Sequence, residues 1–349
     1  MAVPDNPKIT VLGAGSIGCY IGGAWLAAGL DIAFLGREKI KREIEEHGLT
    51  LSDPDKWAVK FEPDRIQFDT SQAALRKADI VLLCVKSTGT EAAAREINRH
   101  VRKGAAVISF QNGVSNADTL RRILPKYEII QAMVPYNVVR LGPGRWHRAT
   151  WGDLTAQDHE VTRALAERIG DRPGRLRAAA DMKGVAWGKL IFNLNNAINA
   201  LSGLTILEEL KQRDFRRVFA AAIIETLDLL EKAGIEPAKI GLVGPKMLPH
   251  VIGSPDFIFK NMFLKVQKID PKGRGSMADD FAAGRPTEID YLNGEVVRLA
   301  AALGKTAPVN QAIVELVKQA ELGVERTWTA KGLCAHILGR HRGARWFGY

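Results

Sequence analysis

The sequence predicts an α/β protein in which a doubly wound, mainly parallel sheet is followed by an all-helical C-terminal domain. Up to about residue 178, short apolar runs of β type alternate with amphipathic stretches, as a parallel sheet covered by helices requires. From Asp181 onward, the apolar residues recur almost wholly with the helical period. A length of 349 residues is also more than one typical domain needs. We therefore expect two domains, at residues 1–178 and 179–349.

The first half repeats a strand-then-helix order. Strands are predicted at 9–12, 31–35, 78–85, 105–110 and 129–134, and helices at 16–28, 38–46, 90–101 and 114–123. This order is that of the Rossmann-type fold, which binds ligands at the carboxyl ends of its strands. Between Tyr136 and Gly152, β-forming residues surround a Gly-Pro-Gly turn, which predicts an antiparallel hairpin at the end of the sheet. In the second half, helices are predicted at 182–200, 215–233, 276–281, 291–303 and 310–321.

The composition narrows the class of protein. Hydrophobic residues make up 46% of the chain and charged residues 25%, the balance of an ordinary globular protein. The first residues lack the apolar core of a signal peptide, and no apolar run is long enough to span a membrane. We therefore expect a cytoplasmic protein with no membrane association. Cys19, Cys84 and Cys334 are widely spaced, and the seven histidines form no ligand motif, so we expect neither a disulfide framework nor a metal site.

The net charge of +10 raises the question of nucleic acid as a partner. The excess is spread thinly, and its densest stretch, 322–349, lacks the interleaved aromatic residues of a nucleic-acid module. We therefore expect no nucleic-acid binding. A solvated basic surface that attracts anionic ligands is the preferred interpretation.

A glycine-rich segment follows the first predicted strand and opens the first helix. It consists of Gly13, Ala14, Gly15, Ser16, Ile17 and Gly18. In this context the first glycine permits a tight turn, the second lets the backbone approach a pyrophosphate, and the third lets helix and strand pack closely. The free N–H groups at the helix N-terminus then face the phosphates. These six residues are candidate cofactor ligands, with a glycine-rich turn that binds nothing as the alternative.

The end of the second strand distinguishes NAD from NADP. An acidic residue there accepts a hydrogen bond from the ribose 2′-hydroxyl, whereas an arginine suits a 2′-phosphate. The sequence has Arg37 at this point, followed by Glu38 and a group of basic residues. It therefore favours NADPH, although Glu38 is a competing candidate and Arg37 could be a plain surface cation.

The first helix of the second half carries polar residues suited to ketone reduction. At about 100° per residue, Lys189, Asn193 and Asn196 share one face, and Asn195 points away from it. Hydride transfer to a carbonyl carbon leaves negative charge on the oxygen, which a lysine ammonium can stabilise and protonate. From this segment alone, a surface helix with a solvated lysine is an equally good interpretation.

Five separated motifs occur in an order that resembles the ketopantoate reductase family. They are the glycine loop, Val85-Lys86, Gln111-Asn112-Gly113, the helix with Lys189 and Asn193, and the segment from Pro286 to Gly294. The resemblance extends over nearly the whole chain, to about residue 321. Each motif alone is weak, but the ordered set is specific.

The resemblance implies roles for the matching residues. Lys189 is then the general acid to the substrate carbonyl, and Glu288 holds this lysine and the substrate hydroxyl in place. Lys86 lies near both nicotinamide and substrate, and Asn112 contacts the cofactor. Taken singly, Lys86 and Asn112 could be loop residues without a role, and Glu288 could belong to a structural ion pair.

On the substrate side, the resemblance implies that Asn193 binds substrate and that Ser276 grips its carboxylate. Two positions depart from the family. Ala197 stands where a second asparagine is usual, with Asn196 one position earlier as its replacement, and Gly273 stands where many members have asparagine. These departures bear on the identity of the substrate side chain more than on the hydride chemistry.

The function that the resemblance implies is NADPH-dependent reduction of ketopantoate to pantoate, for pantothenate and coenzyme A. The partner is thus a small 2-keto acid, and a homodimer is compatible with the sequence. Two alternatives stay open at this point. One is a reductase of another branched 2-keto acid, and the other is a non-catalytic NADP-sensing protein.

Overall fold

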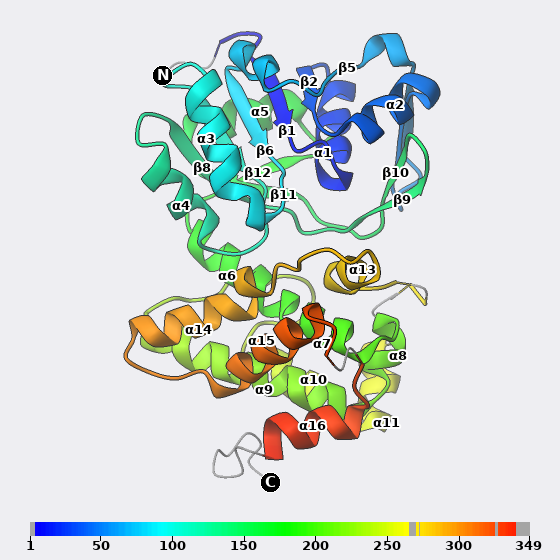
Figure 1. Ribbon diagram of the computed structural model, residues 1–349, viewed down its shortest axis with the longest axis vertical. Helices are drawn as coiled ribbons and strands as arrows, with labels where there is room; N and C mark the ends of the chain where they lie inside the picture. The colour runs from blue at the N-terminus through cyan, green and yellow to red at the C-terminus, as the bar shows by residue number, and fades with distance from the viewer. Residues whose placement is uncertain (1–3, 265–269, 272, 325–326, 340–349) are drawn as a thin grey trace. The chain divides into compact units, whose positions relative to one another are not determined.

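The computed structural model describes residues 4–264, 270–271, 273–324 and 327–339. The chain forms two compact units, Met1–Met182 and Lys183–Tyr349. The first unit is built on a mainly parallel sheet and the second is helical, which confirms the predicted fold class (Figure 1). The basic residues Arg340, Arg342 and Arg345, part of the predicted basic surface, lie outside the described residues.

The main sheet of the first unit has eight strands in the order β12-β11-β8-β7-β6-β1-β2-β5. From β5 to β8 all neighbours are parallel, β11 runs antiparallel to β8, and β12 pairs parallel with β11. The strands are β1 (Lys8–Leu12), β2 (Asp31–Leu35), β5 (Gln67–Asp69), β6 (Ile80–Leu83), β7 (Ala106–Ser109), β8 (Glu128–Met133), β11 (Leu154–Gln157) and β12 (Leu176–Ala179). The helices that connect them are α1 (Ser16–Ala27), α2 (Glu38–His47), α3 (Thr90–His100), α4 (Asn116–Ile123) and α5 (Glu160–Ile169).

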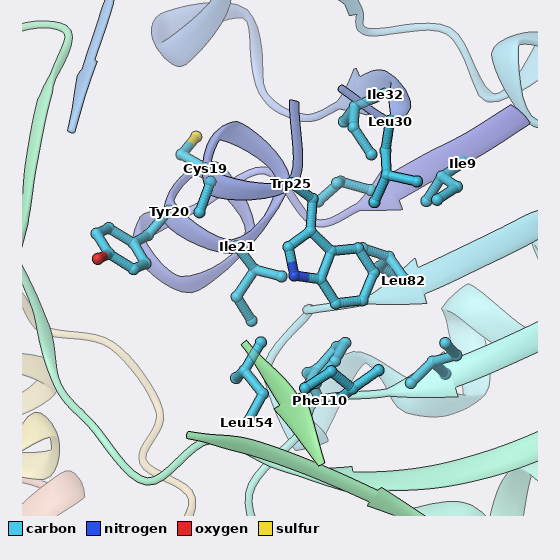
Figure 2. Packing of buried hydrophobic residues seen from close by; sticks show 14 of the residues in the cluster. Ile9, Cys19, Tyr20, Ile21, Trp25, Leu30, Ile32, Leu82, Phe110 and Leu154 are labelled. Atoms are coloured by element: carbon cyan, nitrogen blue, oxygen red, sulfur yellow. The ribbon is translucent and has the colours of Figure 1, made fainter. Parts of the chain in front are cut away.

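The central strands are apolar on both faces because helices cover both. Along β6, Ile80 and Leu82 pack into one hydrophobic cluster, and Val81 and Leu83 into the other. Continuous apolar runs of this kind are the signature of a buried parallel strand. Figure 2 shows the first cluster, with Trp25 of α1 packed between sheet residues. The core on this face therefore fixes α1 against the strand that precedes it.

The predicted hairpin is present, but its predicted place was wrong. β9 (Val138–Gly142) and β10 (Arg145–Arg148) pair antiparallel. They belong to a separate four-stranded sheet, with β3 (Leu49–Ser52) and β4 (Ala58–Phe61), in the order β4-β3-β10-β9. The turn sequence determines the hairpin locally, whereas its partner β3 is about ninety residues away, and no local pattern indicates that pairing.

The second unit is a set of helices around α9. Its longer helices are α6 (Met182–Asn193), α7 (Asn195–Ser202), α8 (Ile206–Leu210), α9 (Arg213–Lys232), α10 (Leu248–Gly253), α13 (Ser276–Ala282), α14 (Asn293–Ala302), α15 (Pro308–Glu321) and α16 (Ala330–Gly339). The single helix predicted at 182–200 is divided at Leu194 into α6 and α7. Asparagine is a weak helix former, and three asparagines surround this break.

The described part of the C-terminal extension folds back on its own unit. α16 packs against α9 and α15. The backbone N–H of Trp328 donates to the carbonyl oxygen of Leu201, near the end of α7, at 2.7 Å. Over the described residues, no helix combines the length and apolar character needed to cross a bilayer. In the same residues, histidine, cysteine and acidic side chains form no group of three or more that could bind a metal.

Candidate active site

The glycine loop connects β1 to α1 through two close backbone contacts. Gly13 has φ +97°, a conformation that L residues rarely adopt, and a Cβ atom there would lie 2.6 Å from the Val85 backbone nitrogen. A Cβ atom on Gly18 would lie 2.5 Å from the Gly13 carbonyl oxygen and 2.9 Å from Val11 Cγ1. Glycine is therefore required at both positions for packing.

Gly15 differs from these two glycines. A Cβ atom on Gly15 would meet nothing closer than the Gly13 carbonyl oxygen at 4.0 Å. The first helical hydrogen bond runs from Cys19 N to the Gly15 carbonyl at 2.9 Å, so the amides of Ser16, Ile17 and Gly18 lie ahead of the helical ladder. An open glycine before free amides fits a pyrophosphate group.

Arg37 lies at the N-cap of α2, directly after β2, and is exposed. A Cβ atom on the preceding Gly36 would lie 2.9 Å from Ala14 Cβ, so this chain segment passes next to the glycine loop. The competing residue, Glu38, has its carboxylate 3.2 Å from Arg42 Nε. Arg37 is thus exposed beside the glycine loop, whereas the Glu38 carboxylate is paired with Arg42.

Lys86 and Asn112 follow β6 and β7, at the same edge of the sheet as the glycine loop. The chain passes from β1 to β2 on one side and places β6 on the other, so the strand order reverses between β1 and β6. Doubly wound folds bind their ligands at this reversal. Lys86 is exposed and Asn112 is half-buried.

A buried polar network that the sequence analysis missed joins these two loops. The Asn116 side-chain amide donates to the Asn112 carbonyl at 2.5 Å and to Ser87 Oγ at 3.0 Å. The Gln111 amide donates to Thr90 Oγ1 at 2.8 Å and to the Val85 carbonyl at 3.2 Å. Several short polar side chains clustered after two neighbouring apolar strands are the sequence signal that could have found it.

Lys189 lies near the end of α6 in the second unit. Its side chain is half-buried, and its neighbours along the helix, Trp187, Leu190 and Ile191, are buried and apolar. Burial disfavours the charged ammonium and lowers the pKa of Lys189 to about 8. An amine with this pKa can both hold and release a proton near neutral pH.

Asn196 and Ser276 are brought together although 80 positions separate them. Asn196 Nδ2 donates to Ser276 Oγ at 3.4 Å, which joins α7 to the N-terminus of α13. Asn193 is buried at the end of α6. As predicted, Asn195 points elsewhere, and its amide donates to Glu209 Oε2 at 3.0 Å.

Glu288 is buried, with 9% of its surface exposed. It precedes the short 3-10 turn Ile289–Tyr291 and does not lie on the long helix, which begins only at Asn293. The Thr287 N–H donates to Glu321 Oε1 at 2.8 Å, so α15 holds the backbone beside Glu288. Glu321 is a further residue that the sequence analysis missed, because nothing local connects it to position 287.

Comparison with known proteins extends over both units. The family model for ketopantoate reductase PanE/ApbA matches residues 9–160, and the model for the C-terminal part of the same family matches residues 181–321. The chain is 28% identical over 319 residues to a 2-dehydropantoate 2-reductase of Pyrococcus abyssi, covering 90% of this chain and 98% of that protein.

Solved structures agree with these matches. A PanE/ApbA family ketopantoate reductase from Ralstonia eutropha is 29% identical, with a TM-score of 0.77 over 90% of this chain and 99% of that one. A D-mandelate dehydrogenase with NADH and anilino(oxo)acetate shares the fold at 20% identity, with a TM-score of 0.72 over 90% of this chain and 99% of that one. The chain belongs to the ketopantoate reductase family, a family of nicotinamide-dependent oxidoreductases.

Proposed function

We propose that this protein reduces 2-dehydropantoate (ketopantoate) to pantoate with NADPH, as a step toward pantothenate and coenzyme A. The observation that carries the proposal is the burial of Lys189, which lowers the pKa of its side chain to about 8. Such an amine suits proton donation to a carbonyl oxygen at physiological pH. The relatives named 2-dehydropantoate 2-reductase support ketopantoate as the substrate.

We assign the cofactor to the first unit. Gly13, Ala14, Gly15, Ser16, Ile17 and Gly18 would hold the pyrophosphate, Arg37 the 2′-phosphate, and Lys86 and Asn112 the nicotinamide end. When bound, NADPH supplies the hydride for the carbonyl carbon. The first unit would thus act as the NADP-binding domain and the second as the substrate domain.

We assign the proton chemistry and substrate binding to the second unit. As charge develops on the substrate oxygen, the Lys189 ammonium would stabilise it and donate the proton, with Glu288 holding the lysine and the nascent hydroxyl. Ser276 and Asn196, whose side chains meet at 3.4 Å, would bind the carboxylate together with the buried Asn193. Lys86 would contact the substrate as well as the cofactor.

Steady-state kinetics with NADPH test this proposal. We expect kcat/KM for ketopantoate to exceed that for 2-ketoisovalerate and for phenylglyoxylate, the keto acid related to mandelate. A higher kcat/KM for 2-ketoisovalerate or phenylglyoxylate would show that this acid, and not ketopantoate, is the preferred substrate. Tight NADPH binding without turnover of any of the three would instead favour the NADP-sensing alternative.

One observation favours a second candidate substrate, another branched 2-keto acid. Ala197 is fully buried where the family usually has a second asparagine, so Asn196 must substitute for that amide from a neighbouring position. A displaced amide would favour another branched 2-keto acid over ketopantoate. We further propose a homodimer and a cytoplasmic location, and the mass of the protein in solution by light scattering tests the first of these.

A further inference from the structure

A buried carboxyl lies behind the residues proposed to bind the substrate carboxylate. Glu209 of α8 has no exposed surface. Its Oε2 atom accepts hydrogen bonds from Asn195 Nδ2 at 3.0 Å and from Asn199 Nδ2 at 3.3 Å. Both asparagines lie on α7, the helix that also carries Asn196. The side chain thus fixes α7 against α8 through two amides.

Asn199 extends this connection to the N-terminus of α13. Its Oδ1 atom accepts a hydrogen bond from the backbone N–H of Gly275 at 2.8 Å. Gly275 is the N-cap of α13 and directly precedes Ser276. A Cβ atom on Gly275 would lie 3.1 Å from Asn199 Oδ1, so the glycine allows this close approach. The backbone before Ser276 is therefore held by the same asparagine that Glu209 orients.

A second contact holds the same loop. The backbone N–H of Ile206, the first residue of α8, donates to the Gly273 carbonyl at 2.9 Å. The loop from Gly273 to Gly275 is consequently attached to α8 directly and to α7 through Asn199. The position of Ser276 relative to Asn196 depends on how α7 and α8 are joined. Glu209 joins them through Asn195 and Asn199, and the Asn199 amide also donates to the Leu204 carbonyl at 3.2 Å.

We propose that Glu209 is a positioning residue for the substrate-carboxylate subsite, acting through Asn199 and Gly275 on Ser276. This inference rests on the proposed function, because it assumes that Ser276 binds substrate. It assigns Glu209 no contact with substrate. Its effect is to keep the Ser276 hydroxyl within reach of Asn196, so that both can bind one carboxylate.

The protonation of Glu209 indicates which replacement preserves this arrangement. Burial raises the pKa of Glu209 to about 8, against the lowering effect of the two asparagine amides and of Arg216. The carboxyl is therefore mainly neutral at pH 7. Glutamine has the same length, is neutral and keeps an acceptor oxygen for the two amides.

The test compares Glu209→Ala, Glu209→Gln and the neighbouring Glu208→Ala. For Glu209→Ala we expect KM for the 2-keto acid to rise about tenfold, the scale of one lost hydrogen bond, with kcat and the Kd for NADPH little changed. Glu209→Gln should restore a KM close to wild type. Glu208→Ala is the matched control. Glu208 caps the same helix with Thr205, and among the described residues its side chain hydrogen-bonds with Thr205 and not with Asn199, so its loss should not displace Ser276. It should lower the melting temperature and leave KM unchanged.

A double-mutant cycle tests the route of the effect. If Glu209 acts through Ser276, adding Glu209→Ala to Ser276→Ala should raise KM much less than it does in wild type. If Glu209→Ala fails to fold, Asn199→Ser takes its place in the cycle, because it removes the amide that donates to Glu209 Oε2 and the oxygen that accepts from the Gly275 N–H. Independent, additive effects, or an equal rise of KM in Glu208→Ala, would overturn the inference and leave the proposed function intact. Wild-type protein that turns over no 2-keto acid would overturn both.

Discussion

The candidate site residues of the two units are positioned by different kinds of contact. In the first unit, the candidate cofactor site is formed mainly by the backbone. Gly13 and Gly18 allow close contacts that a Cβ atom would block, and the space beside Gly15 is open. In the second unit, side chains from separate helices are joined by polar contacts, such as the buried contact of Asn199 with Glu209 and the exposed contact of Asn196 with Ser276. A backbone site can be recognised from a short local pattern, whereas a side-chain site depends on packing between distant elements.

The two units also differ in the groups that bear on specificity. The sheet edge of the first unit offers positions common to doubly wound folds, and Arg37 is the residue that we propose to select NADPH over NADH. The second unit carries Lys189, whose pKa is lowered to about 8, together with the amides and the hydroxyl that we propose to bind a carboxylate. Changes in the first unit should therefore act on cofactor binding, and changes in the second on turnover and on substrate binding.

The largest expected effect is on turnover, from Lys189→Ala. Loss of a general acid costs about a hundredfold or more in kcat, and the Kd for NADPH should stay close to wild type. Stopped-flow turnover and fluorescence titration with NADPH measure the two quantities. Lys183→Ala, at an exposed position of the same helix, is the control and should leave both unchanged. An unaltered kcat in Lys189→Ala would remove this residue from the mechanism.

The next effect concerns the cofactor, from Arg37→Ala. Loss of charge-assisted hydrogen bonds to a 2′-phosphate should weaken NADPH binding by about ten- to a hundredfold, while KM for NADH stays nearly constant. The ratio of kcat/KM for the two cofactors reports the difference. Lys39→Ala, exposed on the same helix, serves as the control. Equal losses with both cofactors would show that Arg37 does not distinguish them.

Two glycine substitutions separate packing from binding in the first unit. Gly18→Ala should lower the free energy of unfolding by about 1–3 kcal/mol, because its Cβ would collide with the Gly13 carbonyl and Val11. Gly15→Ala should leave stability within about 0.5 kcal/mol of wild type, since its Cβ meets open space, but raise KM for NADPH about tenfold. Urea denaturation and initial rates measure the pair. A normal KM in a stable Gly15→Ala would contradict the phosphate assignment.

The last expected effect is a pH dependence that belongs to the second unit and is absent near neutral pH. The pKa of Lys189 is lowered to about 8, so the ammonium needed as proton donor is present below that pH and is lost above it. We expect kcat at saturating NADPH to be constant below pH ~8 and to fall about tenfold per unit above it. Any residual activity of Lys189→Arg should lack this decline, because arginine stays protonated. A flat profile in wild type would assign the proton to another group.

Much of the first unit could be predicted because its signals are local. The alternation of buried strands and helices, the glycine loop and Arg37 each follow from a few neighbouring residues. The hairpin at 138–148 was also predictable, but its sheet was not, since β3 and β10 pair across about ninety residues. In the second unit, the helical period of the apolar residues predicted the helices. The clustered asparagines at 193–196 indicated a polar function but did not predict the break at Leu194.

The sequence by itself determined the repeated strand-and-helix order, the glycine-rich turn before α1 and the face of α6 that carries Lys189, because backbone sterics and the helical period act within a few residues. Only the tertiary structure decided that Asn196 meets Ser276, that Glu321 holds the backbone beside Glu288, and that Glu209 is buried against two asparagines. Those contacts join residues on separate helices, and their partners are chosen by the packing of whole elements.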